Sequence, residues 1–127
     1  MPYPTDITLK KASRRLLISF DDGQTFDYSC EFLRVYSQSA EVTGHAPGQE
    51  TLQIDKQDVG IEAISPVGNY AIRLHFDDGH DSGLYTWERL YELGQNYQAC
   101  WVDYLRRLMR AGHSHPDLTR LKKEAGK

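Results

Sequence analysis

The sequence predicts an α+β protein in which one small unit of antiparallel strands and a short helix occurs twice. Residues 17–36 and 72–93 repeat each other: both contain Phe-Asp-Asp-Gly, and both continue into a Tyr, a hydroxyl residue and a Glu. The glycine of each Asp-Asp-Gly turn can adopt a positive φ, and Ser29 or Thr86 is placed to cap a helix. A third observation is an apolar stripe at helical spacing near the C-terminus. We therefore expect two small antiparallel β units related by an internal duplication, and a C-terminal amphipathic helix.

The strands are predicted from apolar residues that alternate with polar ones. In the first copy two strands flank a polar turn at residues 11–14, and a third returns after Gly23. In the second copy a Pro and a Gly-Asn pair within residues 65–69 are typical of a turn, and the alternation resumes beyond it. Strands are expected around residues 7–9, 16–20, 26–28, 61–64 and 70–76, and the connection over residues 37–58 has no clear periodicity.

The last helix is predicted from one uninterrupted apolar face. Its members recur at helical spacing and end before Gly112, which is a typical residue after a helix C-terminus. We expect this face to pack on the protein's own core, although so aromatic a stripe could also serve a partner. We expect one domain over residues 1–111 and a basic, loosely ordered tail over 112–127, in which His113 and His115 are solvated. The stripe consists of Tyr97, Cys100, Trp101, Tyr104, Leu105, Leu108 and Met109.

Composition and charge exclude several classes of protein. The 127 residues carry a formal charge of −3, which gives no overall electrostatic reason to bind nucleic acid. The charge is uneven, because residues 102–127 hold 7 Lys+Arg against 3 Asp+Glu; a solvated helix face is the simpler interpretation, with RNA or an acidic surface as alternatives. No segment is apolar enough to span a membrane, so a cytoplasmic protein is expected. Cys30 and Cys100 are expected to be buried thiols rather than a disulfide.

Several segments resemble one known family. They are Val67-Gly68-Asn69-Tyr70-Ala71-Ile72, the stretch from Phe76 to Trp87, Phe32-Leu33-Arg34 and residues 39–45. Together they resemble the bacterial DUF971 family, which is similar to the N-terminal domain of γ-butyrobetaine hydroxylase and trimethyllysine hydroxylase. The resemblance covers roughly residues 5–110. In those hydroxylases the iron- and 2-oxoglutarate-dependent chemistry belongs to a separate, larger domain, which has no counterpart in this chain, so the resemblance does not imply an oxygenase.

The resemblance also bears on metal binding. The hydroxylase domain carries a zinc site made by three cysteines that follow a Leu-Arg pair and by one histidine after the second Asp-rich turn. Here His80 matches the histidine, but the residues after Leu33-Arg34 contain no cysteine, and serine is no substitute for a thiolate. A rebuilt site remains open, in which Glu41, His45 and His80 converge as one carboxylate and two imidazoles that suit zinc or iron. No metal cofactor is required by the pattern.

These observations predict a non-catalytic accessory module that binds a protein partner. The expected binding face combines the loop from Glu41 to Gly48 with the second turn around His80, Tyr85 and Trp87, together with Arg34. The alternative is a metal-binding module linked to metal or iron–sulfur handling. A small enzyme is the third class, and no catalytic signature supports it: Cys30 and Cys100 have no identifiable base, and Asp-Asp-Gly lacks the calcium-loop pattern.

Overall fold

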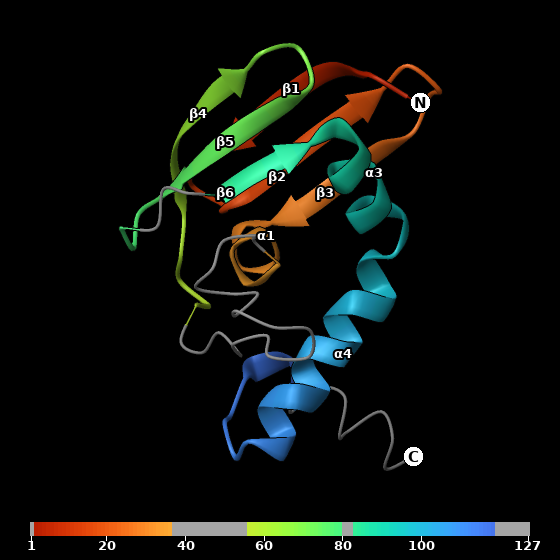
Figure 1. Ribbon diagram of the computed structural model, residues 1–127. Helices are drawn as coiled ribbons and strands as arrows, with labels where there is room; N and C mark the ends of the chain where they lie inside the picture. The colour runs from red at the N-terminus through yellow and green to blue at the C-terminus, as the bar shows by residue number, and fades with distance from the viewer. Residues whose placement is uncertain (1, 37–55, 80–82, 119–127) are drawn as a thin grey trace, which may run out of the picture. The chain divides into compact units, whose positions relative to one another are not determined.

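The computed structural model describes residues 2–36, 56–79 and 83–118 (Figure 1). The chain forms two compact units, Met1–Gln95 and Asn96–Lys127. The predicted strands and short helices lie in the first unit, and the long C-terminal helix lies in the second.

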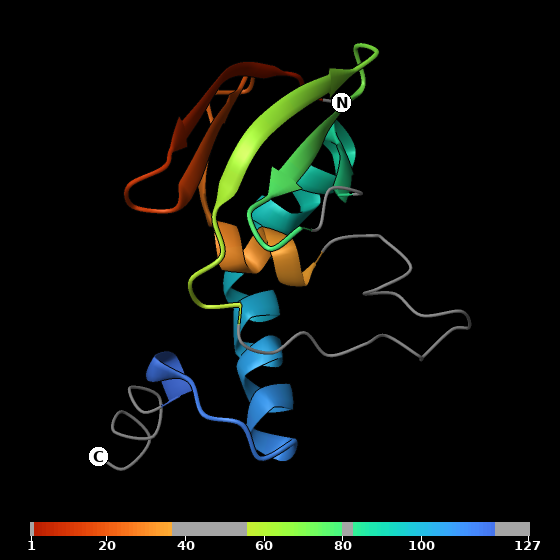
Figure 2. The same ribbon diagram turned by 90° about the vertical axis from the view of Figure 1, so that its left-hand side faces the viewer.

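The first unit contains two three-stranded antiparallel sheets, each followed by a helix (Figures 1 and 2). In both sheets the strands follow one another in chain order, as expected for a hairpin-connected repeat. The α+β class and the duplication are therefore confirmed. The first copy is β1 (Pro4–Lys10), β2 (Arg15–Phe20), β3 (Thr25–Ser29) and α1 (Cys30–Val35); the second is β4 (Ile61–Val67), β5 (Ala71–Phe76), β6 (Gly83–Thr86) and α3 (Trp87–Gln95).

The core of this unit comes from both copies, and its strand residues occupy equivalent positions. Strand β2 buries every second side chain, and β5 does the same at equivalent positions, so that each sheet has one apolar face. The helices add further buried side chains, because α1 is buried along its whole length. The main apolar members are Leu16, Ile18, Phe20, Phe32 and Leu33 in the first copy and Ile72, Leu74, Phe76, Leu90 and Leu93 in the second.

The predicted turns and caps are present in both copies. Gly23 has φ 89° and Gly79 has φ 87°, a region that favours glycine, so the Asp-Asp-Gly segments are turns as predicted. The Ser29 hydroxyl accepts the backbone N–H of Phe32 at 3.1 Å and caps α1. Thr86 accepts the N–H of Arg89 at 3.0 Å and does the same for α3.

Two buried tyrosines tie the copies together reciprocally. The hydroxyl of Tyr28 on β3 donates to the carbonyl oxygen of Leu90 in α3 at 2.6 Å. Its equivalent on β6, Tyr85, donates to the carbonyl oxygen of Leu33 in α1, which is the equivalent of Leu90. Burial raises the pKa of Tyr28, so its hydroxyl keeps the donated proton over the physiological range. The exchange of equivalent contacts is the signature of a pseudo-twofold relation between the copies.

The second unit is built on α4 (Tyr97–Arg110). Gly112 has φ 81°, its N–H donates to the Met109 carbonyl, and the His113 N–H donates to the Leu108 carbonyl, the two bonds of a Schellman helix ending. His115 is only 6% exposed, and its ring packs edge-on against Trp101 and Tyr104. The expectation that His115 is solvated is therefore wrong. The predicted boundary at residue 111 and the packing of α4 on the core stay predictions.

Candidate binding site

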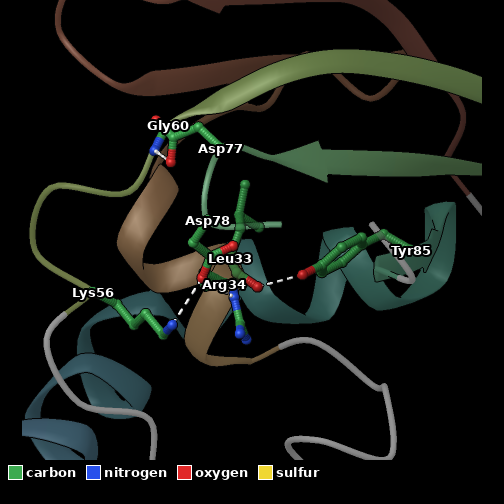
Figure 3. Close-up of polar contacts among 7 residues, drawn as sticks. All are labelled: Leu33, Arg34, Lys56, Gly60, Asp77, Asp78 and Tyr85. Carbon is green, nitrogen blue, oxygen red and sulfur yellow. Dashed lines mark hydrogen bonds and ion pairs between the residues drawn. The ribbon is translucent and has the colours of Figure 1, made fainter. Parts of the chain in front are cut away.

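The second Asp-Asp-Gly turn holds a charge cluster against the end of α1 (Figure 3). One carboxylate oxygen of Asp78 accepts hydrogen bonds from Arg34 Nε at 2.9 Å and from Lys56 Nζ at 2.8 Å. The Arg34 side chain is only 5% exposed, and a cation so deeply buried needs a carboxylate beside it. Asp78 therefore fixes Arg34, and with it the last turn of α1, to the second copy.

Asp77, the residue before, braces the turn from its other side. Its carboxylate accepts the backbone N–H of Gly60 at 3.0 Å, and its own N–H donates to the Gly60 carbonyl at 2.9 Å. A Cβ at position 60 would lie 3.0 Å from the Asp77 carboxylate, so any larger residue requires this carboxylate to shift. The chain entering β4 is thereby held to the turn that leaves β5 (Figure 3).

The first copy repeats this arrangement with different chemistry. Asp21 pairs with the backbone of Tyr3 as Asp77 pairs with Gly60. Asp22, the equivalent of Asp78, accepts the hydroxyl of Tyr91 at 2.5 Å; Tyr91 stands in α3 where α1 has Arg34. This hydrogen bond lowers the pKa of Asp22 and raises the pKa of Tyr91. The second aspartate of the turn is thus bonded by a neutral hydroxyl in the first copy and by two cations in the second.

An aromatic patch, consisting of Tyr70 and Trp87, lies where α3 begins. The Trp87 indole N–H donates to the Asn69 carbonyl at 2.9 Å, and its backbone N–H donates to the Tyr70 carbonyl at 3.1 Å. Tyr70 is 53% exposed and Trp87 is partly buried. The two sequence segments around residues 67–72 and 85–87 therefore meet, and hydrogen bonds hold the Trp87 ring and the backbone of Tyr70 in place.

The structure places the predicted site residues differently. Arg34 lies beside the second turn, as the prediction requires, but it is almost fully buried. Tyr85 is 0% exposed and bonded to Leu33, so its predicted place on the binding face is corrected: it holds α1 from within the core. Trp87 reaches the surface only in part. Glu41, His45 and His80 lie outside the described residues.

Sequence reasoning missed Lys56, Asp78 and Tyr70 as parts of this region. The duplication contained a usable signal for Asp78, because both copies place a second aspartate before the turn glycine. No comparable signal marks Lys56, which comes from the connection between the copies and has no equivalent in the first one.

The described residues offer little to a metal or to a nucleophilic reaction. Within residues 2–36, 56–79 and 83–118, no three His, Cys, Asp or Glu side chains are grouped so as to hold a metal ion. Asp78 is already bound by two cations, which disfavours a third positive charge beside it. Cys30 and Cys100 are free thiols; Cys30 is buried as predicted, whereas Cys100 is only half-buried. Burial raises the pKa of Cys30, which makes it a poor nucleophile at neutral pH.

The fold and this region define a small α+β domain made by duplication of a three-stranded sheet and a helix. The chain belongs to the family described as gamma-butyrobetaine hydroxylase-like, N-terminal, whose model matches residues 7–91. The resemblance to DUF971 is confirmed by a solved structure from Acidithiobacillus ferrooxidans, a protein of unknown function of that family. It is 34% identical, with a TM-score of 0.58 over 72% of this chain and 91% of the other.

Two NMR solution structures are similar over more of the chain. One is 54% identical, covers 91% of this chain and 86% of its own, and has a TM-score of 0.77. The other is 47% identical, covers 90% of each chain, and also has a TM-score of 0.77. No curated protein matches this sequence. Among the described residues, no helix is long and apolar enough to cross a membrane.

Proposed function

We propose that this domain is a non-catalytic interaction module that binds a protein partner through the aromatic patch, with the second turn, at the opposite end of β5 and β6, as part of its rigid frame. The observation that carries the proposal is the exposure of Tyr70 beside Trp87, with both segments fixed by bonds to backbone carbonyls. Rigid, partly exposed aromatic side chains are enriched at the centres of protein interfaces, because they bury a large area at a small entropic cost.

The second turn supports this function by its rigidity. Arg34, Lys56 and Asp78 form one ion-paired cluster, and the Tyr85 hydroxyl donates to the Leu33 carbonyl of α1 (Figure 3). The end of α1 is thus held to the second turn, and the start of α3 is held separately by the bonds of Trp87 to Asn69 and Tyr70, so that the surface is preorganised before a partner arrives. An interaction module needs such preorganisation, and it needs no nucleophile or general base.

Site-specific photo-crosslinking tests the proposal. A photoreactive phenylalanine replaces Tyr70 in the full chain, and a matched control carries it at Tyr3, which is 55% exposed against 53% for Tyr70. In cells that express the chain, we expect a discrete crosslinked adduct from position 70 and none from position 3. Adding Trp87→Ala to the position-70 variant should weaken the adduct. Equal adducts from both positions, or none from position 70, would contradict the proposal.

Metal binding is the competing proposal. It rests on Glu41, His45 and His80, with zinc or iron as the metal, and all three residues lie outside the described ranges. The charge on Asp78 supports the interaction module instead, because its two cationic partners oppose a metal ion close to the turn. Partner binding is therefore the function that we place first.

A further inference from the structure

The duplication allows one copy to serve as a control for the other on the outer faces of the sheets. The outer face is the one opposite the buried Leu16, Ile18 and Phe20 in the first sheet, and opposite Ile72, Leu74 and Phe76 in the second. The registers place equivalent residues in equivalent rows. The central row is Thr8, Leu17 and Asp27 in the first sheet and Ser65, Arg73 and Leu84 in the second.

The outer face of the first sheet satisfies its own polar groups. Arg15 Nε donates to the Asp27 carboxylate at 2.7 Å, and the Ser19 and Thr25 hydroxyls are hydrogen-bonded at 2.9 Å. The cation and the anion lie on neighbouring strands of one face, so the face carries no excess charge from this pair. Because these charges neutralise each other, they give no electrostatic reason for this face to bind a partner.

The equivalent face of the second sheet has a cation, at a different position, and no carboxylate at the position of Asp27. Leu84 stands where the first copy has Asp27, Ala71 stands where it has Arg15, and Arg73 stands in place of Leu17. In the described part of the chain the Arg73 side chain has neither an ion pair nor a hydrogen bond. Residues 1–101 carry 15 Asp+Glu against 8 Lys+Arg, so acidic side chains outnumber basic ones in this part of the chain. A mid-strand arginine without a counter-charge is therefore unexpected there.

The surroundings of Arg73 add donors and apolar area, and the exposed Glu62, in the β-bulge between Ile61 and Ala63, forms no ion pair with Arg73. His75, the next outward residue of β5, has its Nε2 atom 2.8 Å from the Ser65 hydroxyl, which holds the imidazole in place. The registers put eight described residues on this face, and none is acidic. They are Ala63, Ser65 and Val67 of β4, Ala71, Arg73 and His75 of β5, and Leu84 and Thr86 of β6.

We propose that the outer face of the second sheet, around Arg73, His75 and Leu84, docks an acidic segment of a partner protein. A carboxylate of the segment pairs with the Arg73 guanidinium, and its apolar side chains cover Leu84 and Val67. The face runs into the aromatic patch, because Arg73 and Tyr70 belong to one continuous run of chain and Thr86 precedes Trp87. The inference rests on the proposed function and specifies the chemistry of the partner.

An NMR titration of the full chain tests the inference. The probe is a short peptide of alternating glutamate and valine, and a lysine–valine peptide is the charge-reversed control. We expect amide shift changes confined to residues 63–67, 71–75 and 84–86, weakening as salt is raised. Arg73→Gln should reduce the affinity about threefold to fivefold, as expected for an exposed ion pair. The matched variant Arg15→Gln, on the self-neutralised face, should leave the affinity unchanged.

Two results would overturn the inference. One is a set of shift changes that appears equally on the first sheet or with the lysine peptide. The other is tighter binding of an equally charged single-stranded oligonucleotide at the same residues, which would assign the face to nucleic acid. The photo-crosslink at Tyr70 separates the two proposals. An adduct that persists unchanged in Arg73→Gln leaves the interaction module standing and removes the acidic-partner assignment.

Discussion

The pair of Asp22 and Tyr91 shows how one side chain sets the chemistry of a turn. The Tyr91 hydroxyl donates to the Asp22 carboxylate at 2.5 Å and stabilises its charged form. We predict that Tyr91→Phe raises the pKa of Asp22 towards its ordinary value of 3.8, because the largest cause of its lowering is removed. Carboxyl chemical shifts followed by NMR against pH measure this pKa. An unchanged titration of Asp22 would show that the hydrogen bond is not formed in solution.

The same pair predicts the sign of a pH effect on stability. Because the pKa of Asp22 is lowered on folding, its contribution to stability is present above the unfolded pKa and is lost as the pH falls through the folded pKa. The difference in the free energy of unfolding between the wild type and Tyr91→Phe should therefore shrink as the pH is lowered. It should not shrink as the pH is raised, as long as the pH stays below the range in which tyrosine titrates. Denaturation at neutral and at acidic pH checks this direction.

The two buried tyrosines provide a matched pair of substitutions. Tyr28→Phe and Tyr85→Phe each leave one buried helix carbonyl without its donor, and each should cost about 1–3 kcal/mol of the free energy of unfolding. Tyr70→Phe, at a side chain that is 53% exposed, should change it by less than about 0.5 kcal/mol. Chemical denaturation of the three variants checks the order. If Tyr85→Phe leaves the free energy of unfolding unchanged, the bond from Tyr85 to Leu33 does not stabilise the fold.

Single residues divide into those that the sequence predicts and those that it does not. Ser29, Thr86, Gly23 and Gly79 were predictable, because caps and turns depend on a few neighbouring residues. The partners of Arg34 were not, because they depend on how one copy lies against the other. The burial of Tyr85 escaped prediction for the same reason.

At the scale of elements, the contact between α3 and β3 depends on Gly94. A Cβ at this position would overlap the ring of Phe26, so the helix can approach the strand only with glycine there. We predict that Gly94→Ala destabilises the domain by about 1–3 kcal/mol through overpacking, although alanine favours helices by up to about 1 kcal/mol. Thermal or chemical denaturation measures the change. Leucine at position 26 has no ring and should relieve the overlap with the new Cβ. Gly94→Ala combined with Phe26→Leu should therefore destabilise the domain by less than the sum of the single changes.

The elements themselves were largely predictable. Both copies alternate apolar and polar residues, and the structure has strands where the alternation occurs. The last helix begins at Tyr97 and ends before Gly112 as its stripe predicts. The error at His115 arose because its partners, Trp101 and Tyr104, lie more than ten residues away along the chain, beyond the range of a local pattern.

At the scale of the whole molecule, the proposed function predicts the metal content. We expect untagged protein purified without chelator to contain less than about one-tenth of an equivalent of zinc or iron, because a closed site requires several correctly placed ligands. Elemental analysis of the wild type beside His80→Ala is the measurement. Close to one equivalent in the wild type, falling in the variant, would favour the metal-binding alternative.

The reciprocal bonds from Tyr28 to Leu90 and from Tyr85 to Leu33 have a consequence for fragments of the chain. Each copy supplies a hydroxyl to the other and receives one back, so neither copy alone satisfies its own helix. A peptide with a single copy would find the missing donor only on a second identical peptide. Two such peptides would meet through the same surface on each, as in an isologous homodimer. The first unit of this protein is, in that sense, a symmetric dimer whose two subunits are joined in one polypeptide.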